Sequence, residues 1–589
     1  MADRDGPVSV LHRRRARVPR AATLATLALL ALVAAPAASG TPGELDRAFG
    51  GGGKVTRQFG LGDHEPSSHG LAMAVAPDGR MTVAGTSTDP DNHPAFLVAR
   101  FTPDGRPDDT FGEAGKVLAQ LGTGSPPYSQ ATAIALTPGG DVVLAGNAND
   151  SPGHSAIAVA RFLPDGSLDP TFGTGGFTQV QLGSGASQAL AVAVDGSGRV
   201  VVAGDTDDGD FRPALAVARF SPDGTLDGSF GSAGRSVAQI GDGADRFSAG
   251  TSLALLPGGD LLVGGEASDA RGNQQMAVLR FSQDGTIDPT FASRGVARLQ
   301  MGSGSNGFST VRALTVAPDG GILIAGEATA PGADEQLALA RYLPNGQLDA
   351  RFGSRGRVRV QLGTGDAPLS TARSLALAER GQILVTGEAT NDEGEGLALV
   401  ARFSSRGVLD RTFGTLGAAR RQFGAGVPGH RFSAGRASAI VAGSRLLVAG
   451  YATDVKENDQ VFLGRFVGGR RAVALVDTVE AGVVDGKARI PLACVGPPGE
   501  LCKGRLALTV PRSTAPGSGR KGRVPVVVAS LRFRLVTSKT RVVNPPLAPF
   551  ARSRLHKKGR LEATWRVVSV DRAGNESSLV VGFTMVPGR

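Results

Sequence analysis

The sequence predicts an all-β protein, in which a seven-bladed β-propeller of four-stranded blades is followed by a small C-terminal β-sandwich. Three observations support this prediction. A unit of about 60 residues recurs along most of the 589-residue chain, each unit contains four short strand-like segments, and the composition changes where the units end. The expected domains are a signal peptide over 1–39, the propeller over 41–468 and the sandwich over 469–589.

The repeat is marked by a Leu-Asp-x-x-Phe-Gly string. It occurs at 45–50, 168–173, 226–231 and 348–353, and related strings fill the intervals between and after these copies. The repeat phenylalanines are Phe49, Phe111, Phe172, Phe230, Phe291, Phe352 and Phe413. They lie 62, 61, 58, 61, 61 and 61 residues apart. A period this regular indicates a repeat architecture, in which each unit stacks against its neighbours.

Each unit is expected to form four strands. In the third copy they are predicted over 177–182, 189–194, 200–203 and 214–220, each bounded by Gly, Pro or Asp. The run Ala-Leu-Ala-Val-Ala at 214–218 is apolar on both faces, which predicts a sheet covered on both sides. Radially stacked blades provide that environment. An open solenoid or a set of paired β-sandwiches is the alternative architecture.

The string Ala-Val-Ala-Arg-Phe-Ser-Pro-Asp-Gly-Thr-Leu-Asp-Gly-Ser-Phe-Gly at 216–231 resembles the bacterial delta-60 repeat. The resemblance covers about residues 45–468. It implies a propeller-like fold, and it brings no known general activity.

Each unit also carries an arginine and, eight residues later, an aspartate. The arginines are Arg100, Arg161, Arg219, Arg280, Arg341 and Arg402, and the aspartates are Asp108, Asp169, Asp227, Asp288, Asp349 and Asp410. We interpret these as charge-assisted pairs that fix the blade edge, with a ring of ligand-binding arginines as the alternative. Arg465 has no such aspartate after it, and the spare copy at 45–50 supplies Asp46. The N-terminal segment is therefore predicted to complete the seventh blade, with Asp46 opposite Arg465.

The loop after the third strand of each unit is rich in acidic residues, which include Asp205, Glu266, Glu327 and Glu388, and this predicts an acidic propeller face. That face is either a solvated rim or a docking surface for another protein. Oxygen ligands crowd at Asp205, Asp207, Asp208 and Asp210, where calcium is the one cofactor considered. Their spacing does not match a complete EF-hand loop.

No known catalytic motif is complete in the sequence, so no catalytic residue is assigned. His64-Glu65 with His69 has one residue too many for a zinc-protease helix, and Pro66 disfavours that helix. Nucleophile elbows in a strand–turn–helix context and phosphate-binding loops are absent. An extracellular propeller enzyme, a lyase or a hydrolase, is kept as the alternative to a non-enzymatic protein.

The N-terminus has the three-part pattern of a secretory signal. A basic head with Arg13, Arg14, Arg15, Arg17 and Arg20 precedes an apolar run over 21–34 and a group of small residues. The run is shorter than the about 20 residues that span a bilayer. We expect a cleaved signal, exported by the general or the twin-arginine route, and a secreted or envelope-associated protein. An uncleaved anchor is the alternative.

The segment 469–589 contains both cysteines and the only tryptophan. Its ending, Trp565 to Asn575, is similar to the closing strands of bacterial immunoglobulin-like or fibronectin-type modules. Export favours a disulfide between Cys494 and Cys502. A mobile loop is expected over 513–521.

This segment is also strongly basic. It has 22 Lys and Arg against 7 acidic residues, and residues 1–40 carry +4. Since the whole chain carries +10, residues 41–468 carry −9. The basic clusters are Arg520, Lys521 and Arg523, Arg532 and Arg534, and Lys557, Lys558 and Arg560; the first and last of these are expected in turns. This asymmetry predicts attachment to an anionic envelope polymer or lipid surface, which weakens with salt. Aromatic residues for stacking on nucleic acid are scarce.

The sequence therefore predicts an exported, monomeric binding or scaffold protein, with the propeller as recognition surface and the basic domain as attachment module. A structural spacer of the envelope is a further alternative. Clustered polar residues outside the repeat pattern, at the mouth of the propeller channel, would favour an enzyme. A channel lined only by repeat residues would favour binding or structure.

Overall fold

A computed structural model describes residues 41–587 of the chain. Short segments are excepted, namely residues 63–64, 152, 208–211, 244–245, 304–306, 333, 379–380, 442–443, 469–472, 477–479, 486, 489, 496–500, 511–525, 537–539, 559–560 and 571–575. The predicted signal peptide lies outside the described residues, as does the loop predicted over 513–521. Among the described residues, no helix has the length and hydropathy needed to cross a bilayer.

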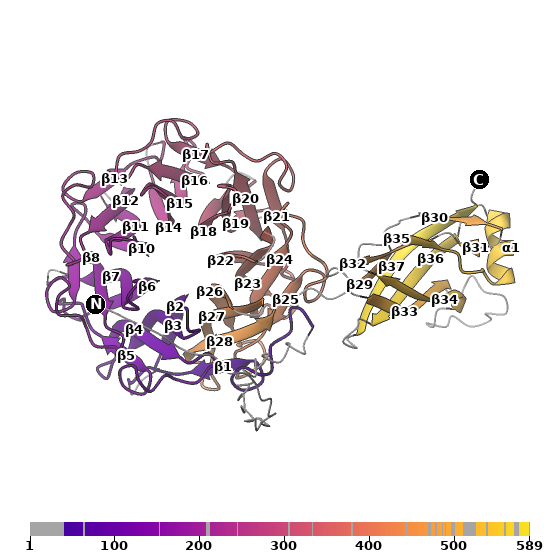
Figure 1. Ribbon diagram of the computed structural model, residues 1–589, viewed down its shortest axis with the longest axis horizontal. Helices are drawn as coiled ribbons and strands as arrows, with labels where there is room; N and C mark the ends of the chain where they lie inside the picture. The colour runs from indigo at the N-terminus through magenta and orange to yellow at the C-terminus, as the bar shows by residue number, and fades with distance from the viewer. Residues whose placement is uncertain are drawn as a thin grey trace, which may run out of the picture. The chain divides into compact units, whose positions relative to one another are not determined.

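Seven four-stranded antiparallel sheets form a propeller (Figure 1). The inner strands are β2 (Ser68–Val75), β6 (Ser129–Leu136), β10 (Ser187–Val194), β14 (Ser248–Leu255), β18 (Ser309–Val316), β22 (Ser370–Leu377) and β26 (Ser433–Val441). The second strands are β3 (Met81–Thr88), β7 (Val142–Asn149), β11 (Val200–Asp207), β15 (Leu261–Ser268), β19 (Ile322–Thr329), β23 (Ile383–Thr390) and β27 (Arg445–Thr453). The third strands are β4 (Pro94–Phe101), β8 (Ser155–Phe162), β12 (Pro213–Phe220), β16 (Gln274–Phe281), β20 (Glu335–Tyr342), β24 (Gly396–Phe403) and β28 (Asp459–Val467). The outer strands are β5 (Lys116–Ala119), β9 (Phe177–Val180), β13 (Arg235–Ala238), β17 (Val296–Leu299), β21 (Arg357–Val360), β25 (Ala418–Arg421) and β1 (Lys54–Arg57).

The predicted all-β seven-bladed propeller is thus confirmed, and the sequence repeat is offset from the blade by one strand. The first predicted strand of the third copy is β9, which belongs to the sheet β6-β7-β8-β9 of the preceding blade. We number the blades 1 to 7 from β2 to β26. Each outer strand is supplied by the start of the next sequence repeat.

The offset explains how the ring closes. β1 pairs antiparallel with β28 in the sheet β1-β28-β27-β26, with Lys54 opposite Gly464 and Arg57 opposite Val461. Before it, Leu45 forms a bridge with Phe466, and Phe49 is fully buried. The N-terminal segment therefore completes blade 7, next to blade 1.

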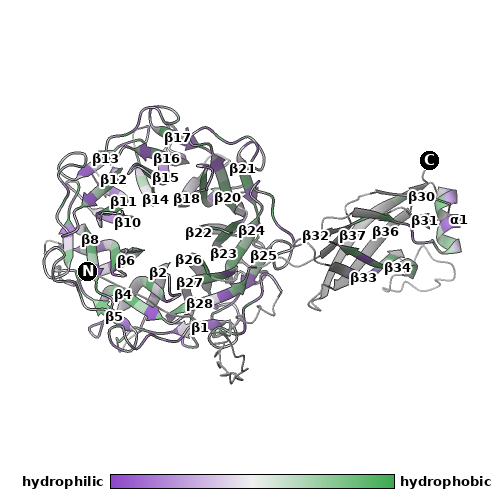
Figure 2. Cartoon of the chain, in the orientation of Figure 1, coloured by the Kyte–Doolittle hydropathy of each residue, from purple (hydrophilic) through white to green (hydrophobic). Residues whose placement is uncertain are grey.

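The core lies between neighbouring blades. One cluster joins Leu262 and Met276 of blade 4 to Val311 and Ile324 of blade 5, and similar clusters recur at the other blade interfaces. Alanines such as Ala338 are fully buried in these interfaces, because a small side chain lets two sheets approach closely. Hydrophobic residues follow the strands, and hydrophilic residues are frequent in the outer turns (Figure 2).

The C-terminal domain has a three-stranded sheet and a six-stranded sheet. The first is ordered β29 (Val473–Val476), β32 (Ile490–Val495), β35 (Thr540–Val543). The second is ordered β31 (Lys487–Ala488), β30 (Glu480–Val484), β37 (Glu576–Pro587), β36 (Leu561–Val570), β33 (Leu501–Val510), β34 (Val526–Val536). Both sheets contribute to one core, which α1 (Pro549–Lys558) joins through Ala551 and Leu555. The helix α1 was not predicted from the sequence.

Candidate functional site

The repeated arginine–aspartate pairs form in all seven blades. Nε lies 2.8 Å from the aspartate oxygen in Arg100–Asp108, and the other pairs span 2.6 to 3.4 Å. Arg100 also lies 4.5 Å from the centre of the Phe111 ring, and its Nη1 donates to the carbonyl oxygen of Pro164 in the turn of the next blade. Arg161, Arg219, Arg402 and Arg465 donate to a carbonyl oxygen of the next blade in the same way, whereas Arg280 and Arg341 bond to two aspartates each. These contacts support the structural interpretation over a ring of ligand-binding arginines.

The pair at the ring closure has the same geometry. Asp46 lies 3.0 Å from Arg465 Nε, and Arg465 lies 4.8 Å from the Phe49 ring centre. Arg445 also approaches Asp46, at 2.6 Å. One buried carboxylate thus pairs with two arginines where the two ends of the propeller sequence meet.

A second set of equivalent positions differs from blade to blade. It follows the central glycine of each second strand, and we call it the polar ring: Thr86, Asn147, Asp205, Glu266, Glu327, Glu388 and Tyr451. The glycine is required where the inner strand bulges, since a Cβ on Gly204 would lie 1.9 Å from the carbonyl oxygen of Gln188. The acidic members were predicted in exposed loops, and this was wrong. They lie inside strands, and Glu327 is only 2% exposed.

The bulge places one further side chain in each inner strand. These residues are Leu71, Thr132, Leu190, Thr251, Arg312, Arg373 and Arg436. The last three come from consecutive blades 5, 6 and 7, and we call them the arginine arc. In the other four blades the position is Leu or Thr, so the arc is no part of the repeat's common framework.

Glu327 connects the first two arginines of the arc. Its Oε1 accepts from Arg312 Nε at 2.9 Å and from Arg373 Nη1 at 3.4 Å. Its Oε2 is buried and has no hydrogen-bond partner among the described residues, and the same holds for Nε of Arg373 and Nε of Arg436. The side chains of Arg312 and Arg373 are 30% and 24% exposed. The arc thus combines unused buried donors with partial access to solvent.

The charges of the arc act on one another. Burial lowers the pKa of Arg373, Glu327 opposes this shift, and the neighbouring charges of Arg436 and Arg312 add to it. Burial also raises the pKa of Glu388 and of Glu335, two carboxyls that act on the arginines of the arc. A bound anion would relieve the repulsion among the three guanidinium groups.

At the junction of blades 7 and 1 the arc meets a second group of side chains. Arg436 Nη2 donates to the hydroxyl oxygen of Tyr451 at 2.7 Å. The Tyr451 ring lies 4.5 Å from the His69 ring and 5.7 Å from the Phe432 ring, centre to centre. His69 Nε2 lies 2.7 Å from Asp459 Oδ2. Cationic, aromatic and acid–base side chains therefore lie close together at the junction of blades 7 and 1.

Another run of arginines on consecutive blades makes contacts between neighbouring blades. Arg298, Arg359 and Arg420 lie on the outer strands of blades 4, 5 and 6. Arg359 Nη1 donates to the carbonyl oxygen of Met301 at 2.8 Å, and Arg298 Nη1 lies 2.5 Å from Asp242 Oδ2. These outer arginines tie neighbouring blades together, whereas those of the arc retain unused donors.

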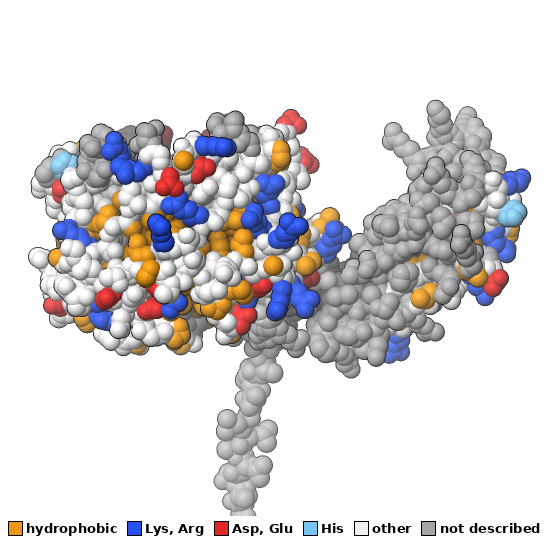
Figure 3. Space-filling model, turned by 90° about the horizontal axis from the view of Figure 1, so that it is seen from above, with side chains coloured by type: hydrophobic (Ala, Val, Ile, Leu, Met, Phe, Trp, Pro, Cys, Tyr) orange, Lys and Arg blue, Asp and Glu red, His pale blue; other side chains and the backbone are white. Residues whose placement is uncertain are grey.

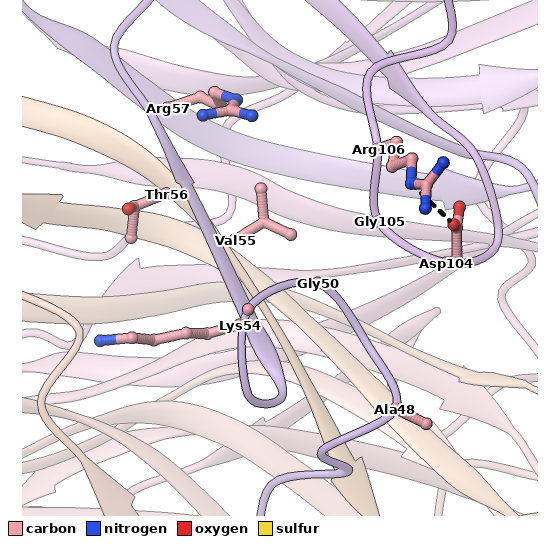
Figure 4. Close-up of a pocket in the computed structure, with 10 residues that line it drawn as sticks. Ala48, Gly50, Lys54, Val55, Thr56, Arg57, Asp104, Gly105 and Arg106 are labelled. Atoms are coloured by element: carbon pink, nitrogen blue, oxygen red, sulfur yellow. Dashed lines mark ion pairs between the residues drawn. The ribbon is translucent and has the colours of Figure 1, made fainter.

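A hollow near the ring closure is a weaker candidate (Figure 4). Lys54, Arg57 and Arg106 line it together with backbone of the closing segment, and Arg106 pairs with Asp104 at 3.2 Å. All three cations are exposed. We find no buried, unpartnered donor among the residues that line it, so the arginine arc is the stronger candidate.

The calcium hypothesis is not tested by the structure. Asp208 and Asp210 lie outside the described residues, and Asp205 accepts hydrogen bonds from Gln188 Nε2 at 3.0 and 3.3 Å. Burial, with smaller contributions from Glu266 and Asp207, raises the pKa of Asp205 to about 6, although Gln188 lowers it.

Over the described parts of residues 41–587, the one group with metal-ligand spacing is Asp89, Asp91 and His93. Its members are brought together by the turn itself, in which Asp89 Oδ1 accepts from the backbone N–H of Asp91 and of His93.

On the side of the propeller visible in Figure 3, cationic and acidic side chains are interspersed.

The predicted sites of the C-terminal domain are described only in part. Cys494 lies on β32 and Cys502 on β33, in different sheets, but their side chains are outside the described residues and the disulfide stays a prediction. The cluster Arg520, Lys521 and Arg523 is likewise not described, nor are Arg560 and the Lys558 side chain. Lys557 is exposed on the last turn of α1, where a turn was predicted.

Sequence reasoning missed the polar ring and the arginine arc. Aligning the repeats at the serine that begins each inner strand would have shown the signal. Arginine stands three residues after Ser309, Ser370 and Ser433, in three consecutive repeats only. Residues common to all copies are those that hold the fold together, and the arc is not among them.

Comparison with known families supports a propeller-like repeat protein. A family model described as "Domain of unknown function (DUF5122) beta-propeller" matches residues 76–111, 138–172, 196–230, 257–291, 317–352 and 381–413. All six matched segments end at a repeat phenylalanine, from Phe111 to Phe413. The corresponding part of blade 7 is divided between the two ends of the propeller sequence. No curated protein matches the chain.

Solved structures similar to this chain are distant. A polysaccharide lyase of family PL25, an ulvan lyase, is 13% identical with a TM-score of 0.40, over 70% of this chain and 96% of that chain. A protein of unknown function from Dyadobacter fermentans is 9% identical with a TM-score of 0.36, over 70% and 98%. Trypanosoma rangeli sialidase is 10% identical with a TM-score of 0.35, over 90% and 89%. These likenesses carry no argument about activity.

Proposed function

We propose that this chain is an exported binding protein whose propeller captures an anionic ligand at the arginine arc. The supporting observation is that Arg312, Arg373 and Arg436 occupy one bulge position in three consecutive blades, and that Arg373 and Arg436 each retain a buried Nε without a hydrogen-bond partner among the described residues. Guanidinium groups bind carboxylates and similar anions through paired, charge-assisted hydrogen bonds. The outer-strand arginines differ, because in the described part of the chain none of them has a buried nitrogen without a partner.

The first test titrates citrate, a small tricarboxylate, into the full-length protein by calorimetry. We expect R373M/R436M to bind at least about tenfold more weakly, because two charge-assisted contacts are lost. The matched control is R359M/R420M, which removes two outer-strand arginines and should leave the affinity unchanged. Equal affinity of the arc variant and the wild type would refute the proposal.

The C-terminal domain is proposed to attach the protein to an anionic surface. Arg552 and Lys557 are exposed on α1, within a segment that carries 22 basic residues against 7 acidic ones. Each basic residue near an anionic membrane contributes about 1 kcal/mol. The double variant R552E/K557E should therefore reduce sedimentation with vesicles that contain anionic lipid, and salt should reduce the binding of both proteins. The same charge change on the propeller, R246E/R271E, is the control, and a loss of equal size there would contradict the assignment.

An enzyme is the second candidate function, and one observation favours it. The polar side chains at the arc lie outside the repeat pattern. Clustered polar residues of this kind favour an enzyme. Within it, His69 is held by Asp459 at 2.7 Å, beside a tyrosine hydroxyl that accepts from Arg436. A histidine oriented by a carboxylate, close to a tyrosine, is an arrangement suited to proton transfer.

A further inference from the structure

We infer that the ligand of the arginine arc is a carboxylated sugar, such as a hexuronate unit of an acidic polysaccharide. This inference rests on the proposed function, because it names the ligand class for the same site. It also rests on a second set of residues. These are aromatic, and the binding of an anion alone would not require them.

Aromatic residues stand just before the inner strands. They are Tyr128, Phe247, Phe308 and Phe432, each directly before the serine that begins β6, β14, β18 or β26. All four are half-buried, whereas the repeat phenylalanines are at most 1% exposed. Two of the chain's three tyrosines, Tyr128 and Tyr451, lie at this end of the inner strands or in the polar ring beside it. An aromatic side chain that keeps part of its surface exposed can serve as a binding platform.

The aromatic groups adjoin the arc directly at blade 7. Phe432, Tyr451 and His69 form a row with ring-centre distances of 5.7 and 4.5 Å. Arg436 contacts the middle member, since it donates to the Tyr451 hydroxyl and its guanidinium carbon lies 5.1 Å from the ring centre. A ligand held by the arc would therefore meet an aromatic surface within the length of one sugar ring.

The arginine arc and the aromatic row together distinguish among anionic ligands. A planar carboxylate matches the fork of donors on a guanidinium group. A pyranose ring adds an apolar face of C–H groups that can cover an aromatic ring, and hydroxyl groups for polar partners such as Glu327 and His69. A simple carboxylate such as citrate would use the arginines but leave the aromatic row uncovered. A uronate uses both.

The test compares three probes on the full-length protein by calorimetry: tetragalacturonate, its fully methyl-esterified form, and citrate. We expect tetragalacturonate to bind at least about tenfold more tightly than citrate, and the ester to bind far more weakly because it lacks the charge. F432A should weaken tetragalacturonate binding about tenfold and leave citrate binding unchanged. R373M should weaken both. The matched control is F177A, at a half-buried phenylalanine that begins the outer strand β9.

Each outcome decides one step. If citrate binds but tetragalacturonate binds no better and F432A has no effect, the sugar inference is wrong and anion binding stands. If neither acid binds, both proposals fail. If the ester binds as well as the acid, the arginines are not the recognition element and the inference fails. Release of shorter products during the titration would support the ligand class and identify the protein as an enzyme.

Discussion

Deleting residues 41–57 should destabilise the propeller far more than an equally long deletion elsewhere on its surface. The deletion removes β1 from blade 7 and uncovers Leu463 and Val461, which are at most 1% exposed. It also removes Asp46, which leaves two arginines without their shared carboxylate. Loss of the Phe49 side chain alone should cost about 3–5 kcal/mol. Thermal denaturation of the purified protein, followed by circular dichroism, measures the effect.

The control restores the segment in a different place. In the other blades, the strand that β1 represents follows the third strand along the chain, as β5 follows β4 after the connection 102–115. Inserting residues 41–57 after Gly468 in the deletion variant recreates that order, and should recover most of the lost stability. A deletion variant that melts together with the parent would show that the ring does not depend on this closure. A failure of the insertion to restore stability would show that the order of the chain matters as well as the contacts.

The fold could be predicted from the sequence because its signals repeat. Arg100 and Asp108 recur at the same spacing in each unit, and the spare Asp46 could be matched to the unpaired Arg465. A contact that occurs seven times gives seven chances of detection. The blade boundary was harder to locate, since Phe177 begins a sequence unit but belongs to the preceding sheet.

The candidate site could not be predicted because its signals break the repeat. Nothing in a local strand pattern shows that Arg312 lies at a bulge, or that Arg373 from the next blade contacts the same glutamate. His69 and Asp459 are 390 residues apart in sequence and meet only because the ring closes. The length of each second strand was also underestimated, which placed Glu327 in a loop rather than in the core. Such contacts depend on the completed ring.

Replacing Arg402 by methionine should have the largest effect of any single change at the repeated arginine. Arg402 is fully buried, its Nε lies 3.1 Å from Asp410, and it stacks 4.8 Å from the Phe413 ring centre. Its Nη1 donates to the carbonyl oxygen of Gly468. R402M keeps much of the side-chain volume but removes the cation that faces Asp410 in a largely buried site. Breaking a buried pair in this way costs about 3–5 kcal/mol.

Arg280 provides the matched comparison, because it occupies the same position of the repeat but is 31% exposed. It lies 3.4 Å from Asp288 and 2.7 Å from Asp260, whose side chain is 28% exposed. R280M should cost about 1 kcal/mol or less, as exposed ion pairs do. Urea denaturation at constant pH and salt measures both variants. The double variant R402M/D410N should regain part of the loss, because no unpaired charge is then left buried. If R402M and R280M cost the same, burial does not set the strength of these pairs, and the arginines do not hold the blades together in the way their contacts indicate.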